Sequence, residues 1–190
     1  VLDVSSIKTN WIMRNLFDVP AESIKSVSIN HSDGDSYTLY KNEKGQEYFD
    51  LENMPTGKEL ASELIINRFG TIFQDLQISG AKSKRSLSKE NKNTRVKVVT
   101  FEGIIGNIIA FKHNDIAYAS FEFSYDEEIG KNNNEEEVKN EDIMSYIINL
   151  NSDAENWWFE IPEFKYDIIK RRLDTITRDI KNLSPEELTE

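Results

Sequence analysis

The 190-residue chain carries a formal net charge of −11 and contains 38% hydrophobic residues, 30% charged residues and no cysteine. This length supports one sizeable core or two small ones, while the missing cysteines exclude disulfides, cysteine-bound zinc and thiol nucleophiles. The negative charge disfavours nucleic acid as a partner, because an acidic body repels the phosphate backbone.

The first predicted elements are three antiparallel strands. Val27 and Ile29 alternate with serines, which is the period of a half-buried strand. The following "SDGDS" contains an Asp-Gly pair typical of a hairpin turn. Tyr37–Tyr40 and Tyr48–Leu51 then read as the second and third strands.

A predicted helix and a basic linker come next. Apolar residues recur at three and four positions from Leu60 to Leu76, which predicts one amphipathic helix. The segment Gly80–Thr94 has no apolar period and reads as a linker. Its cations could touch phosphates or anionic lipid heads, but a solvated connector is the favoured interpretation, because no aromatic residue is interleaved. These cations are Lys82, Lys84, Arg85, Lys89 and Lys92.

A second set of strands follows the linker. Arg95–Phe101, Asn107–Lys112 and Ile116–Phe123 are predicted as another antiparallel meander. Tyr125–Asp142 is rich in carboxylates and reads as a solvated acidic insert. A short helix is expected around Ile143–Ile148.

The segment "WWFEIPEFKYDIIKRRLDTI" ends the folded part of the sequence. Trp157–Ile161 predicts a strand, and a long helix is expected after Pro162 to about Leu183. Trp157, Phe159 and Ile161 would face the core. Trp158 alternates to the other face, so it is the best candidate for an exposed contact with a partner.

The order of these elements predicts an α+β protein with two similar halves, each an antiparallel β-meander packed against a helix. The predicted segments are an N-terminal tail (1–10), a first half (11–79), the basic linker (80–94), a second half (95–183) that contains the acidic insert (125–142), and a C-terminal tail (184–190).

One weak metal site is considered. His31, Asp33 and Asp35 alternate along the chain, so in an extended segment they could point the same way and bind a divalent cation. The competing interpretation is an ordinary polar hairpin turn, which is favoured because a calcium loop needs more oxygen ligands.

The sequence contains none of the common catalytic or nucleotide-binding motifs. It has no nucleophile elbow, zinc-protease motif, phosphate loop or dinucleotide fingerprint. We therefore expect no enzyme activity and no cofactor.

The two ends of the chain resemble a known bacterial family. "FDVPAESIKSVSI" from Phe17 and "WWFEIPEFKYDIIKRRLDTI" from Trp157 are similar to the opening and closing segments of the family called domain of unknown function 4340. The resemblance extends over roughly Trp11 to Lys181. Val19-Pro20, Ile161-Pro162 and Arg171-Arg172 match its pattern as structural positions. The resemblance carries over no catalytic residue.

The resemblance implies a place in the cell envelope. Members typically carry an N-terminal membrane anchor followed by a domain on the extracytoplasmic face, and the chain here begins at Val1 without an initiator Met. Some members are associated with transport or gliding-motility complexes. The first hypothesis is therefore a non-enzymatic module that binds a protein partner, such as a transporter or motility subunit, with membrane contact only through such an anchor.

The alternative hypothesis is a domain that binds or processes a small ligand or a polysaccharide. Such a domain would use a cleft between the two halves. A pocket with converging polar groups would favour it, and a filled interface between the halves would count against it.

Overall fold

The computed structural model describes residues 19–133 and 140–180. The strands are β1 (Ile24–His31), β2 (Ser36–Tyr40), β3 (Asp50–Leu51), β4 (Lys58–Leu60), β5 (Gly80–Ser83), β6 (Asn93–Thr100), β7 (Ile104–His113), β8 (Ile116–Tyr125), β9 (Trp157–Glu160) and β10 (Thr177–Asp179). The helices are η1 (Ala21–Ser23), α2 (Glu63–Asn67), η2 (Arg68–Thr71), α3 (Glu127–Asn133), α4 (Asn140–Ala154), α5 (Glu163–Ile169) and α6 (Leu173–Ile176).

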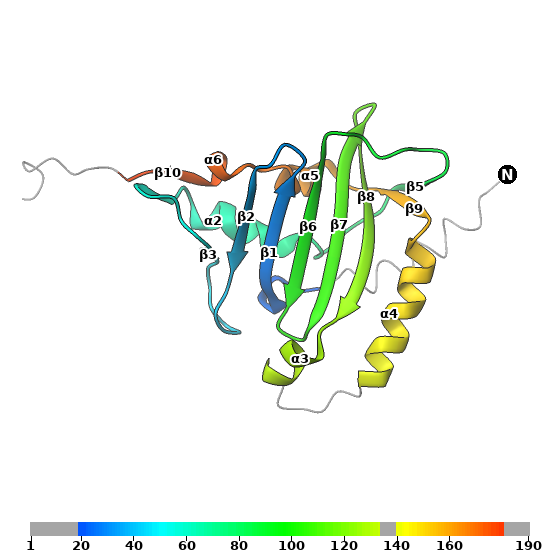
Figure 1. Cartoon of the computed structure of the whole chain (residues 1–190), viewed down its shortest axis with the longest axis horizontal. Helices are drawn as coiled ribbons and strands as arrows, with labels where there is room; N and C mark the ends of the chain where they lie inside the picture. The colour runs from blue at the N-terminus through cyan, green and yellow to red at the C-terminus, as the bar shows by residue number, and fades with distance from the viewer. Residues whose placement is uncertain (1–18, 134–139, 181–190) are drawn as a thin grey trace, which may run out of the picture.

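Eight strands form one antiparallel sheet in the order β3-β2-β1-β6-β7-β8-β9-β5, and β4 and β10 form a separate two-stranded ribbon (Figure 1). The α+β class is thus confirmed, as are both predicted meanders and the strand at Trp157. The first hairpin turns at the predicted Asp-Gly pair, where Gly34 has a φ of 99° and the amide of His31 bonds the carbonyl of Asp35.

The two meanders do not form separate halves. β1 pairs with β6 from Ile24 opposite Thr100 to His31 opposite Thr94. One core cluster extends from Leu39 on β2 to Phe159 on β9. The prediction of two similar halves is therefore not confirmed, because this pairing merges them into one sheet over one core.

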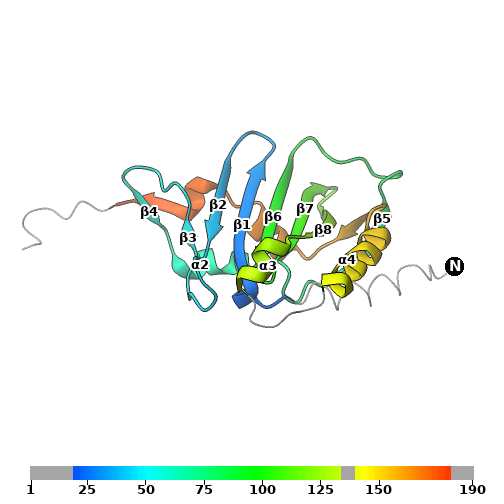
Figure 2. The same cartoon turned by 60° about the horizontal axis from the view of Figure 1, so that its bottom comes forward.

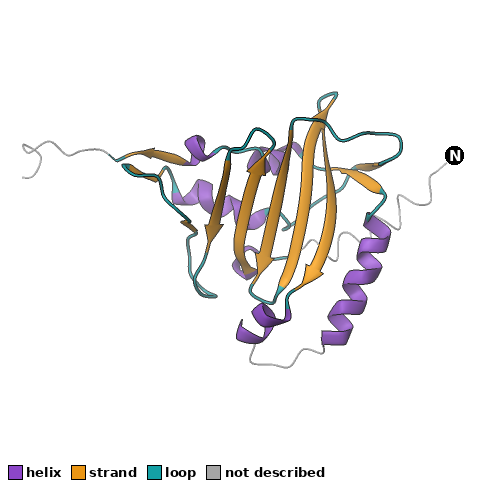
Figure 3. Cartoon of the chain, in the orientation of Figure 1, coloured by secondary structure: helices purple, strands orange, loops and turns teal. Residues whose placement is uncertain are grey.

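The sheet has one covered face and one open face. Val27 and Ile29 point into the core with Val96 and Val98 opposite them. Helices α2, η2 and α5 lie behind the sheet in Figures 1 and 3, with η2 against β1 and α5 against β8. Helix α4 packs on β8, and it lies with α3 at the lower end of the sheet, which Figure 2 turns toward the viewer.

The single helix predicted from Leu60 to Leu76 is wrong. Leu60 belongs to β4, Leu64 is 77% exposed, and the helical region consists of the short α2 followed by η2. Gly70 approaches Ala21 and Phe49 so closely that an added Cβ would lie 3.2 Å from the Phe49 ring. The chain turns tightly at this point. The turn buries Ile72, Phe73 and Leu76 in the main core, which a straight helix from Leu60 would not do.

The long final helix is also wrong. Helix α5 ends at Ile169, and Arg172 has an extended backbone with φ −101° and ψ 155°. After α6 the chain pairs with β4, with Thr177 opposite Leu60. The predicted end near Leu183 and the C-terminal tail lie outside the described residues.

The predicted linker and insert contain regular structure. Gly80–Ser83 is strand β5, which pairs with β9. The described part of the acidic insert contains α3 and the start of α4, and the short helix predicted at Ile143 is part of α4. The N-terminal tail and residues 134–139 lie outside the described residues. Among the helices that the structure describes, none combines the length and apolar composition needed to span a bilayer.

A buried lysine fastens α5 to the end of η2. Lys165 is 3% exposed, and its ammonium donates hydrogen bonds to the carbonyls of Thr71 and Gln74. Burial lowers the pKa of Lys165. Because these bonds satisfy two carbonyl groups beside the core, the residue has a structural role.

We expect Lys165→Met to lower the free energy of unfolding by about 1–3 kcal/mol, because two carbonyl groups lose their partner. Denaturation in urea measures the change. The matched control is Lys89→Met, since Lys89 is exposed and makes no hydrogen bond or ion pair within the described residues; it should stay within about 0.5 kcal/mol of the parent. Equal effects of the two variants would contradict this role.

Candidate functional site

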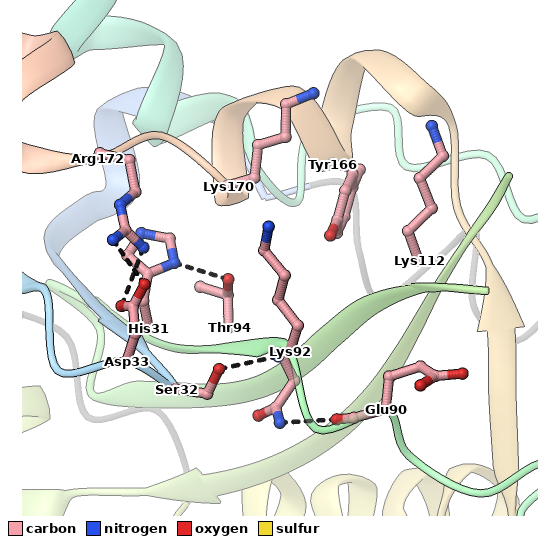
Figure 4. A pocket seen from close by; sticks show the side chains of 11 residues that line it. His31, Ser32, Asp33, Glu90, Lys92, Thr94, Lys112, Tyr166, Lys170 and Arg172 are labelled. Carbon is pink, nitrogen blue, oxygen red and sulfur yellow. Dashed lines mark hydrogen bonds and ion pairs between the residues drawn. The ribbon is translucent and has the colours of Figure 1, made fainter.

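A cavity of about 630 Å³ lies where the β1–β2 turn meets the start of β6, the end of β7 and the end of α5 (Figure 4). We call it the hairpin pocket. It is lined by His31, Ser32, Asp33, Glu90, Lys92, Asn93, Thr94, Lys112, Tyr166, Lys170 and Arg172.

His31 is fixed through both ring nitrogens. Nε2 lies 2.8 Å from the carbonyl oxygen of Arg171, and Nδ1 lies 2.9 Å from the hydroxyl of Thr94. A carbonyl only accepts, so Nε2 carries a proton and Thr94 can donate to Nδ1. The hydroxyl of Tyr37 donates to the same Arg171 carbonyl at 2.8 Å. These bonds attach the end of α5 to the first hairpin.

Arg172 closes one side of the pocket with two carboxylates. Its Nη1 and Nη2 donate to the two carboxylate oxygens of Asp33 at 3.0 and 2.7 Å, and its Nε lies 3.1 Å from Asp35. The hydrogen bond from Arg172 lowers the pKa of Asp33. Such a two-point contact fixes orientation as well as charge. The backbone amide of Leu173 also donates to Asp35.

This arrangement argues against the metal site that was considered at His31, Asp33 and Asp35, and agrees with the favoured interpretation of a polar hairpin turn. His31 points to Thr94 and the Arg171 carbonyl, while Asp33 and Asp35 share the Arg172 guanidinium. Within residues 19–133 and 140–180, no group of three or more His, Asp or Glu side chains is arranged to hold a metal ion. The carboxylates are already neutralised by an arginine whose approach no local sequence pattern could indicate.

Three lysines surround the remaining space. Lys112 pairs with Glu163 at 2.9 Å and Lys170 pairs with Asp167 at 2.6 Å. Lys92 makes no ion pair with any residue that the structure describes, and in Figure 4 its side chain extends into the space between Thr94 and Lys170.

Tyr166 supplies a neutral hydrogen-bonding group to the same pocket. Burial raises the pKa of Tyr166, so the phenol stays protonated at neutral pH. The pocket therefore offers one free ammonium beside a hydroxyl that can donate or accept.

Trp158 is buried, so its predicted exposure is wrong. It lies on the sheet face opposite the main core, as the alternation predicted, but only 5% of it is exposed. Its Nε1 donates to the carbonyl of Leu87 at 2.9 Å, and its ring meets that of Phe111 edge-on at 4.8 Å. With Tyr118 these residues form a second, smaller core beneath the segment 84–92.

The cations of the basic linker are exposed, as expected of a solvated connector, but the segment also contributes residues to the hairpin pocket and to the second core. Lys84 lies over the Trp158 ring at 5.2 Å, and Glu90 pairs with His113 at 2.6 Å. Lys92 then enters the hairpin pocket. The one signal in the sequence is Leu87, a lone apolar residue in a polar run, which anchors the segment to the second core.

No protein-family model, no curated protein and no solved structure matches this chain. The resemblance to domain of unknown function 4340 therefore stays a prediction.

We expect Arg172→Gln to raise the pKa of Asp33 toward its ordinary range, because the hydrogen bond that lowers it is lost. Asp33 has a depressed pKa in the folded state. Its pairing therefore stabilises the fold above the unfolded-state pKa, and this contribution is lost as pH falls through the folded-state pKa. An NMR titration of side-chain carboxyl shifts measures the change. Arg85→Gln is the control, and an unchanged Asp33 titration in Arg172→Gln would refute the assignment.

Proposed function

We propose that this chain is a non-enzymatic binding module whose ligand places a small anionic group in the hairpin pocket. The observation that carries the proposal is Lys92. It is the one cation lining the pocket without an ion pair among the described residues, whereas Lys112, Lys170 and Arg172 are each paired. A free ammonium in a partly enclosed site is suited to a carboxylate or phosphate.

The charges around Lys92 support an anionic ligand. The two carboxylates that line the pocket are both engaged, Asp33 with Arg172 and Glu90 with His113. The charge of Asp33 is thus compensated by Arg172, and Glu90 already shares a hydrogen bond with the His113 ring. The cavity of about 630 Å³ also lies within the usual range for small-ligand sites.

The geometry supports the ligand-binding hypothesis more than the protein-contact one. The protein-contact hypothesis loses the one residue that supported it, because Trp158 lies in the second core; its other grounds, the resemblance and the lack of catalytic motifs, are unchanged. A cleft along the seam between the meanders is filled by the β1–β6 pairing. The hairpin pocket instead lies at the end of that seam, and both meanders and the linker contribute to its lining. The envelope location, the anchor and a transport or motility partner remain expectations from the resemblance alone.

Inorganic phosphate and citrate are suitable first probes. We expect one or both to shift the backbone amide signals of Asn93 and Thr94 in NMR titrations, because these residues lie beside Lys92 in the pocket lining. Lys92→Gln should weaken binding about tenfold or more, since it removes one charge-assisted contact.

Lys89→Gln is the matched control, because Lys89 is on the same segment but does not line the pocket. It should bind like the parent. Binding that is unaffected by Lys92→Gln, or no binding of either anion at millimolar concentration, would overturn the proposal.

A further inference from the structure

A second hollow lies on the open face of the sheet, on the side away from the main core. It has a volume of about 390 Å³ and extends over parts of β1, β6, β7 and β8. We call it the open-face site. Its lining includes Asn30, Lys84, Arg95, Lys97, Asn107 and Glu122.

The strand register arranges these side chains in rows across the sheet. Lys97 on β6 lies opposite Ser28 on β1 and Asn107 on β7. Arg95, two residues earlier on the same face, lies opposite Asn30 on β1 and Ile109 on β7. Lys97 is therefore flanked by polar side chains on both neighbouring strands and Arg95 by one on β1, and these side chains are close enough to act on one ligand.

The two cations on β6 are unpaired among the described residues, whereas Lys84 is attracted by the nearby carboxylates of Glu122 and Glu155. Arg95 and Lys97 are exposed, and neither they nor Lys84 makes an ion pair within the part of the chain that the structure describes. Glu122 is the only carboxylate in the lining. Residues two apart on a strand are about 7 Å apart, so Arg95 and Lys97 repel each other. A chain with 34 acidic residues thus leaves a local excess of positive charge here.

Lys84 is held in place as the wall of the site. Its ammonium lies 5.2 Å from the centre of the Trp158 ring, and its backbone amide bonds the carbonyl of Asn156 at 2.9 Å. The cation–aromatic contact and the backbone bond hold a third positive charge in place beside Arg95 and Lys97.

We propose that the open-face site binds an acidic polysaccharide. Arg95 would hold a sugar carboxylate at two points through its guanidinium, and Lys97 would bind another as a point charge. Asn30 and Asn107 would bind sugar hydroxyls, since each amide both donates and accepts. The rows extend across four strands, which suits an extended chain of sugars.

Other polyanions fit less well. A nucleic acid carries a dense line of charge that the acidic body repels. An acidic peptide typically adds to a sheet through its backbone at an edge, whereas this face offers only side chains. A polysaccharide with one carboxylate per sugar has a sparser charge and many hydroxyls.

The test uses trigalacturonate, with the neutral trisaccharide maltotriose as the ligand control. NMR titration of the whole chain should show trigalacturonate shifting amide signals of residues 28–30, 95–97 and 107–109, and maltotriose should shift them far less. The double substitution Arg95→Gln with Lys97→Gln should weaken trigalacturonate binding at least about tenfold.

Two controls separate this inference from the proposed function. Arg85 is an exposed arginine next to Lys84 in the basic linker, and it does not line the open-face site. Arg85→Gln should therefore bind trigalacturonate like the parent protein. Lys92→Gln should leave the trigalacturonate shifts of residues 28–30, 95–97 and 107–109 unchanged, because Lys92 lines the other pocket.

Several outcomes would overturn the inference. They are no shift with trigalacturonate, shifts confined to the hairpin pocket, equal shifts with maltotriose, or tighter binding of polyglutamate or of a single-stranded oligonucleotide. Shift mapping on the parent protein decides the matter even where the double variant folds poorly.

Discussion

The antiparallel pairing of β1 with β6 is the constraint on which the rest of the structure depends. Without it the chain would consist of two three-stranded meanders, each with little surface to bury. With it, Val27 and Ile29 share one core with Val96 and Val98. The same ladder aligns Asn30 with Arg95 on the opposite face, so one set of backbone bonds determines both the core and the open-face site.

The end of α5 is the second determinant, because it creates the hairpin pocket. A helix that continued past Ile169 would carry the next residues away from the first hairpin. Instead the Arg171 carbonyl accepts bonds from His31 and Tyr37, and Arg172 binds Asp33 and Asp35. Exposed ion pairs individually contribute little to the stability of a fold. Here they add to the two hydrogen bonds that His31 and Tyr37 make with the partly buried carbonyl of Arg171. The last segment is thereby joined to residues about 140 positions earlier.

Sequence patterns correctly predicted most strands of the large sheet, whose side chains alternate between two faces. They failed for the two long predicted helices, whose ends depend on contacts with residues distant in the sequence. The strands of the two meanders could be predicted from alternating apolar residues such as Val27 and Val96, because successive side chains of a strand point to opposite faces of the sheet. Nothing local shows that Arg172 meets Asp33, so the final helix was extended too far. For the same reason Trp158 was placed on the correct face but wrongly exposed, since its cover is Leu87, 71 residues earlier. Of the hairpin pocket's lining the sequence singled out His31, Asp33 and Lys92, but not that they meet, because they come from segments that only the fold brings together.

The distribution of charge connects the two proposed sites. Carboxylates outnumber cations in the whole chain, yet Lys92 in one site and Arg95 and Lys97 in the other have no ionic partner among the described residues. The segment 84–92 links them, since Lys84 lines the open-face site and Lys92 the hairpin pocket. An acidic body repels anions at long range, and this repulsion is screened over about 8–10 Å at physiological salt. Selectivity would then come from close contacts: a ligand must have charges sparse enough to approach and placed so that they meet these few cations.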